Sequence, residues 1–143
     1  MRTRKSLVLA MAAVALGSGL AVATPAAQAE PSSKPAVQAS WVLIWGPVSH
    51  APTKYWATAD YVPRSKVLGS NARCWGGEDG TDLRIDVVRT SDKKVVKKGG
   101  WGRCNGGWMN INMSDARPGT SYYMRIYLRG KAHTIEARAF HKI

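Results

Sequence analysis

Residues 121–129 read Ser-Tyr-Tyr-Met-Arg-Ile-Tyr-Leu-Arg, and this stretch decides the fold class. Tyr122, Met124, Ile126 and Leu128 fall on one side of the alternation, and a Tyr-Arg-Tyr-Arg series falls on the other. A period of two is typical of a β-strand with one face in a core, whereas a helix repeats its apolar residues every three or four positions. We therefore predict a strand over residues 121–129.

The same period recurs elsewhere in the chain. Residues 83–87 alternate apolar side chains with charges, and residues 108–113 place Met109, Ile111 and Met113 on one face. Weaker strands are expected over 55–58, over 67–75 with a bulge at Gly69, and over 132–140 after a hairpin turn at residues 130–131. The apolar run 41–45, ended by Gly46-Pro47, predicts a strand buried on both faces. About eight strands with turns every 8–12 residues predict an all-β fold, an antiparallel β-sandwich or small barrel.

The N-terminal residues have the features of a secretory leader. Arg2, Arg4 and Lys5 precede an apolar run, and residues 27–29 form an Ala-Gln-Ala cleavage site. A membrane anchor is the alternative, but the run is short and is followed by small residues. We expect a signal peptide over 1–29, typical of a bacterial leader, a flexible segment over 30–39, and a single β domain over 40–143. We therefore expect a secreted, extracellular protein with no membrane span.

The chain has two cysteines, Cys74 and Cys104. In an oxidising compartment two thiols in a small domain pair, so we predict one disulfide between them. The alternatives are a metal site, which would need closer ligand spacing, and a reactive thiol, which would need a neighbouring base.

One predicted sheet face combines aromatic rings with amide and guanidinium groups. If strands 108–113 and 121–129 pair as a hairpin, their outward side chains form a single ligand-binding patch. Such rings stack on sugars while the polar groups bind hydroxyls, although the same set also suits single-stranded nucleic acid or an ordinary cross-strand ladder. The predicted patch comprises Trp108, Asn110, Asn112, Tyr123, Arg125, Tyr127 and Arg129.

The charge indicates the kind of partner. The chain carries a net charge of +12, and removal of the three basic leader residues leaves +9. An extracellular cation of this size favours anionic wall polymers, acidic glycans or free DNA, although lysines around residues 93–98 also fit a solvated edge strand. We predict a non-catalytic protein that binds a polysaccharide or cell-wall polymer. The alternative is a cationic interaction protein, such as an inhibitor of a foreign enzyme or a toxin-like factor, acting through the Gly- and Trp-rich loop 101–108.

Catalytic and metal-binding motifs give little support to an enzyme. The chain has no nucleophile elbow, P-loop or zinc-protease motif, so a small hydrolase is the weakest alternative. Glu78, Asp79 and Asp82 lie together in a Gly-rich stretch, where their carboxylates are candidate calcium ligands or simply part of a solvated turn. Apart from this calcium candidate we expect no cofactor.

Overall fold

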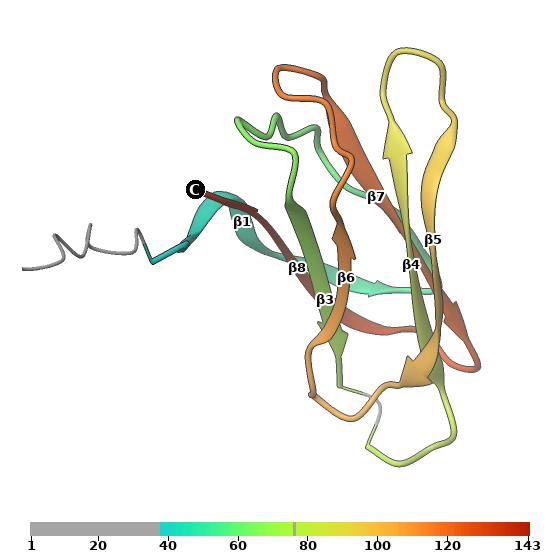
Figure 1. The fold of residues 1–143 in the computed structure, drawn as a ribbon. Helices are drawn as coiled ribbons and strands as arrows, with labels where there is room; N and C mark the ends of the chain where they lie inside the picture. The colour runs from blue at the N-terminus through green and yellow to red at the C-terminus, as the bar shows by residue number, and fades with distance from the viewer. Residues whose placement is uncertain (1–37, 76) are drawn as a thin grey trace, which may run out of the picture. The chain divides into compact units, whose positions relative to one another are not determined.

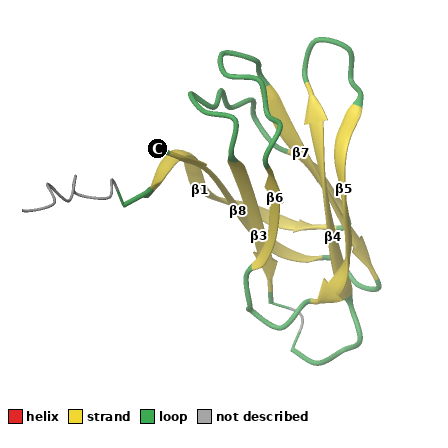
Figure 2. Cartoon of the chain, viewed as in Figure 1, coloured by secondary structure: helices red, strands yellow, loops and turns green. Residues whose placement is uncertain are grey.

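Two antiparallel four-stranded sheets pack face to face in the computed structural model, which describes residues 38–75 and 77–143 (Figure 1). The described residues form strands and loops without any helix, as Figure 2 shows. The predicted antiparallel sandwich is therefore confirmed. The expected leader 1–29, and residues 30–37 of the expected flexible segment, lie outside the described residues.

Consecutive strands lie in different sheets, except for β4 and β5, which pair with each other in sheet B. Sheet A has the strand order β1-β8-β3-β6, and sheet B has the order β2-β7-β4-β5. In sequence order the strands are β1 (Trp41–Thr53), β2 (Tyr55–Ala57), β3 (Leu68–Cys74), β4 (Asp82–Arg89), β5 (Val95–Arg103), β6 (Met109–Met113), β7 (Tyr122–Arg129) and β8 (His133–Lys142).

The core lies between the sheets and is built by the alternating strands. On β7 the apolar side chains of Tyr122, Met124, Ile126 and Leu128 are all buried, as the alternation predicts. On β4 the apolar residues at 83, 85 and 87 are buried as well, and Ile111 and Met113 of β6 oppose them from sheet A. The polar partners in each alternation therefore lie on the two outer faces.

The hairpin between residues 108–113 and 121–129, on which the predicted patch depends, does not form. β6 pairs with β3 in sheet A, whereas β7 lies between β2 and β4 in sheet B. Residues 114–121 cross from one sheet to the other, and the turn at Gly119 (φ 79°) is closed by Thr120 N–H donating to Arg117 O at 3.1 Å. The Gly130 turn likewise joins the two sheets and is not an in-sheet hairpin. Because each of these connections joins two sheets, the strands on either side of it face the core from opposite sheets.

The strand expected to be buried on both faces is an edge strand. β1 pairs only with β8, and it continues past Gly46-Pro47 to Thr53 through irregularities in its register. Trp41 and Leu43 are 46% and 45% exposed, because the outer side of an edge strand has no neighbour to cover it. Ile44 and Trp45 pack partly against the core.

The predicted disulfide joins the two sheets. Cys74 ends β3 of sheet A, Cys104 follows β5 of sheet B, and their Cα atoms are 5.0 Å apart. Both cysteines are buried. The bond therefore fastens one end of the sandwich.

Candidate binding site

The seven residues of the predicted patch do not lie together. Trp108, Asn110 and Asn112 belong to the outer face of sheet A, and the outward residues of β7 belong to the outer face of sheet B. The cause is the sheet crossing between β6 and β7, which places the two halves on opposite sides of the core. Each outer face has to be considered by itself.

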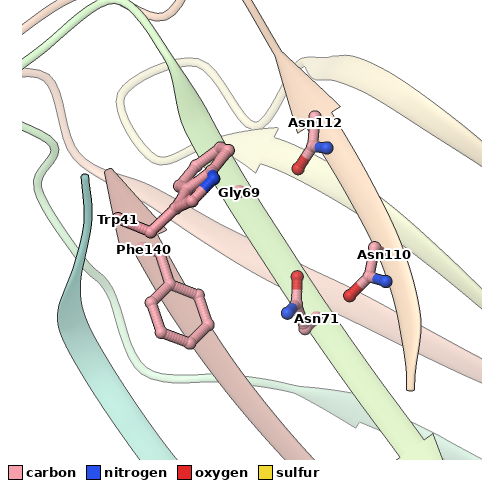
Figure 3. A pocket seen from close by; sticks show the side chains of 6 residues that line it. All are labelled: Trp41, Gly69, Asn71, Asn110, Asn112 and Phe140. Carbon is pink, nitrogen blue, oxygen red and sulfur yellow. The ribbon is translucent and has the colours of Figure 1, made fainter. Parts of the chain in front are cut away.

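The outer face of sheet A is hollowed, and we call this feature the amide hollow. Its volume is about 350 Å³, and side chains from β1, β8, β3 and β6 contribute to it (Figure 3). In the sheet, Gly69 stands between Phe140 on β8 and Asn112 on β6. The lining residues are Trp41, Gly69, Asn71, Asn110, Asn112 and Phe140.

Gly69 makes room for one of the two aromatic walls. The β3 register runs without a shift on both sides of Gly69, so the predicted bulge is absent there. Instead, the indole of Trp41 lies across the glycine (Figure 3), and a Cβ at this position would be 3.0 Å from a Trp41 ring carbon. A side chain at 69 would therefore displace the ring or fill the hollow.

Three amides supply the polar groups of the hollow. Asn71 on β3 is paired in register with Asn110 on β6, and Asn112 lies two residues further along the same strand. None of the side-chain hydrogen bonds within residues 38–75 and 77–143 involves these amides. Each amide can donate two hydrogen bonds and accept others, so the hollow offers directional groups that the fold does not use.

Next to the hollow, rings and guanidinium groups stack in an alternating series. The guanidinium carbon of Arg138 is 3.8 Å from the ring centroid of Trp108, and that of Arg73 is 4.4 Å from it. Arg73 also donates two hydrogen bonds to Glu136 Oε2, at 2.8 and 3.0 Å, which holds its position. The series runs through Trp75, Arg73, Trp108, Arg138 and Phe140.

This stack changes the expected role of Trp108. Its ring is half-buried and already contacts two guanidinium groups, whereas Trp41 has 46% of its surface exposed beside the hollow. A ring that already has cation–π partners is less available to a ligand. Trp41 is therefore the ring most open to stacking on this face.

The outer face of sheet B carries a ladder of arginines and rings. Arg84 lies over both Trp101 and Tyr127, at 5.0 and 4.7 Å from their centroids, and Arg129 lies over Trp101. Asp82 pairs with Arg129 at 2.6 Å. These contacts link side chains that face each other across β5, β4 and β7, so the fold itself uses most of the polar groups of this face.

Tyr123 and Arg125 belong to the same ladder. The Arg125 guanidinium donates to the Tyr123 hydroxyl at 2.9 Å, and this hydrogen bond raises the pKa of Arg125. Lys93 lies over the Tyr123 ring, which is almost fully buried. Among the exposed rings of this face, Tyr55 at 49% is tilted against Tyr127 with centroids 5.3 Å apart.

Two of the three candidate calcium ligands, Asp79 and Asp82, pair with basic side chains of the fold. Asp79 accepts from Thr81 N–H and pairs with His133 Nε2, and hydrogen bonds from Thr81, with a smaller contribution from His133, lower the pKa of its carboxyl. Asp82 pairs with arginine, and Glu78 has positive φ in the turn. Across residues 38–75 and 77–143, no three His, Cys, Asp or Glu side chains are close enough to hold a metal ion.

The Gly- and Trp-rich loop is shorter than expected. β5 extends to Arg103, so Trp101 belongs to sheet B, while Trp108 stacks on the outer face of sheet A. Between them, Gly106 N–H donates to Cys74 O at 2.8 Å, which ties the loop to the end of β3. Its two tryptophans therefore do not form one surface.

From the sequence, only two of the six residues that line the amide hollow were predicted, Asn110 and Asn112. Trp41 sits in an apolar run that looks like a buried strand, and Phe140 is the single phenylalanine of the chain. Asn71 and Arg73 alternate with buried residues of β3, so an outward polar face could have been found from this period. A glycine in a predicted strand can mark either a β-bulge or the close approach of another side chain, and the sequence around Gly69 does not distinguish the two.

In comparisons with known proteins, no protein-family model, curated protein or solved structure matches the chain. Within the described residues, no helix is long and apolar enough to cross a membrane. The functional argument therefore depends on the geometry of the two outer faces.

Proposed function

We propose that the protein is secreted and binds a polysaccharide or cell-wall polymer, without catalysis, in the amide hollow of sheet A. The observation that carries this proposal is the combination of an exposed indole, a second ring and three unused amides around a glycine floor. Sugar rings present apolar faces to aromatic rings and hydroxyls to amides, and this hollow offers both kinds of contact.

Two features favour this hollow over the outer face of sheet B. The arginines of sheet B are engaged with rings and carboxylates, whereas the side-chain amides of the hollow make no hydrogen bond within the described residues. The hollow is also partly open to solvent on the outer face of sheet A, so a ligand larger than the hollow can enter it with one part.

Binding without catalysis is supported by the groups that line the hollow. None of its six described lining residues has an acidic or basic side chain that could transfer a proton near neutral pH. Glu136 on the neighbouring part of β8 is held by two hydrogen bonds from Arg73. Secretion is supported by the leader-like sequence 1–29 and by the disulfide.

The test compares two exposed rings on opposite faces. Trp41→Ala should weaken binding to soluble polysaccharides about two- to tenfold, because one aromatic contact is worth about 0.5–1.5 kcal/mol. Tyr55→Ala is the matched control, since Tyr55 is 49% exposed and Trp41 46%, but Tyr55 lies on sheet B. Affinity electrophoresis against a panel of polysaccharides measures both. Equal losses for the two variants, or a loss for Tyr55→Ala alone, would rule out the hollow as the site.

A further inference from the structure

A second hollow lies on the other side of β6, between the edge strands β5 and β6. Its volume is also about 350 Å³, and Asn110 and Asn112 line both hollows. Lys97 and Lys98 of β5 line the second hollow from the sheet B side. The two hollows are therefore neighbouring parts of one surface that continues across a single strand.

Consecutive glycines help to keep the second hollow open. The β4–β5 register shifts between Arg84 and Asp86, and this irregularity brings Gly99 against the chain of β4. A Cβ at Gly99 would be 2.4 Å from Ile85 O, so the close approach requires glycine. Gly100 follows, and a Cβ at this position would meet no atom within 4 Å. The space between β5 and β6 beside it therefore stays open.

Neither of the two lysines makes a salt bridge with the described residues, although Lys98 lies opposite Asp86 in the β4–β5 register. Within residues 38–75 and 77–143, the acids of sheet B and its β4–β5 turn are paired with arginines. Both lysines are exposed. The paired acids are Asp82, Asp86 and Asp92.

The lining of both hollows is also free of negative charge. None of the described residues that line either hollow is acidic, so an anion would meet amides and ammonium groups without repulsion from the walls. The net charge, which is +12 for the whole chain and +9 without the three basic residues of the leader, acts in the same direction at longer range.

Building on the proposed function, we propose that the polymer is an anionic glycan that crosses β6. Its sugar rings occupy the amide hollow beside Trp41, and its carboxylate or phosphate groups meet Lys97 and Lys98 in the second hollow. Asn110 and Asn112 contact the polymer where it crosses β6, because they line both hollows. The lysines thus select for charge and the amide hollow selects for sugar.

The test removes the two charges and compares the result with an equal change elsewhere. Lys97→Gln with Lys98→Gln removes the charges at the second hollow. Lys54→Gln with Lys131→Gln removes two exposed lysines near the turns beside β2 and between β7 and β8, across sheet B from β5. All three proteins are titrated with polygalacturonate, with a poly(glycerol phosphate) wall polymer and with a soluble neutral glucan, at low and at moderate salt. Circular dichroism checks that each variant is folded.

We expect the Lys97/Lys98 variant to lose about tenfold in affinity for an anionic polymer at low salt, and the control pair to lose less than twofold. The variant should also show a weaker salt dependence, and its affinity for the neutral glucan should be unchanged. A loss confined to the carboxylate polymer or to the phosphate polymer identifies which anion is recognised.

Other outcomes overturn the inference. If Trp41→Ala weakens polysaccharide binding but the Lys97/Lys98 variant behaves like its control, the charge-selective crossing is wrong and the proposed function stands. If Trp41→Ala has no effect on any polymer, the proposed function itself fails. Tighter binding to single-stranded DNA than to every glycan would assign the surface to nucleic acid instead.

Discussion

Gly69→Ala should weaken polysaccharide binding while leaving the fold intact. The added methyl carbon would lie 3.0 Å from a Trp41 ring carbon and 3.1 Å from Asn112 Oδ1, whereas ordinary contacts begin at 3.4 Å. Both side chains must therefore shift by a few tenths of an ångström, and the methyl group raises the floor of the hollow. The substitution thus changes the shape of the proposed site without removing any of its groups.

The expected magnitude follows from these contacts. A misplaced Trp41 ring loses part or all of a stacking contact worth about 0.5–1.5 kcal/mol, which corresponds to a two- to tenfold lower affinity. Alanine within a strand is favoured over glycine by about 0.5–1 kcal/mol, which offsets the cost of moving side chains that border solvent. The free energy of unfolding should therefore stay within about 1 kcal/mol of the wild-type value.

Two measurements on the same protein separate these effects. Urea unfolding gives the stability, and calorimetric titration with the polysaccharide bound by the wild type gives the affinity. Ala57→Val is the control, because it adds apolar carbon to an exposed position on β2 of sheet B. Unchanged affinity of a folded Gly69→Ala variant would show that the ligand does not use the hollow.

Two further substitutions probe the fold around the site. Trp108→Ala removes the ring beneath two guanidinium groups. Each cation–π contact is worth about 0.5–1 kcal/mol, so the substitution should lower the free energy of unfolding by at least about 1–2 kcal/mol. Urea unfolding that is indistinguishable from the wild type would refute the stacking. Asp92→Asn should lower Tm above pH 4, and this difference should shrink steadily as the pH falls from 4 through 2. The hydrogen bond from Arg89 lowers the pKa of Asp92 from 3.8 to about 2, so its stabilisation is lost as the folded carboxylate is protonated. A Tm difference that stays constant from pH 6 to pH 2 would contradict that pairing.

Strands with one buried face were predictable from sequence. The alternation at 83–87 and 121–129 arises because one side of each strand packs into the core. The apolar residues of both alternations are buried in the structure, as expected. The disulfide was predictable for a different reason, because two cysteines allow only one intramolecular pair. The alternation depends only on neighbouring residues in the sequence, and the disulfide depends only on the number of cysteines.

Sheet membership was not predictable in the same way. Met109, Ile111 and Met113 alternate identically whether β6 pairs with β7 or with β3, so the pattern does not say which sheet receives the strand. The apolar run containing Trp41 is equally consistent with a central strand and with the exposed edge that it forms beside β8. The amide hollow depends on both of these long-range choices, and for this reason only its β6 residues appeared in the predicted patch.

The most direct test of the proposed site is a titration of the isotopically labelled protein with the bound polysaccharide, followed by NMR. The side-chain amide signals of Asn71, Asn110 and Asn112 and the indole N–H signal of Trp41 should shift together and saturate with the same affinity. Saturable shifts confined to Trp101, or to the arginine ladder of sheet B, would contradict the assignment of binding to sheet A.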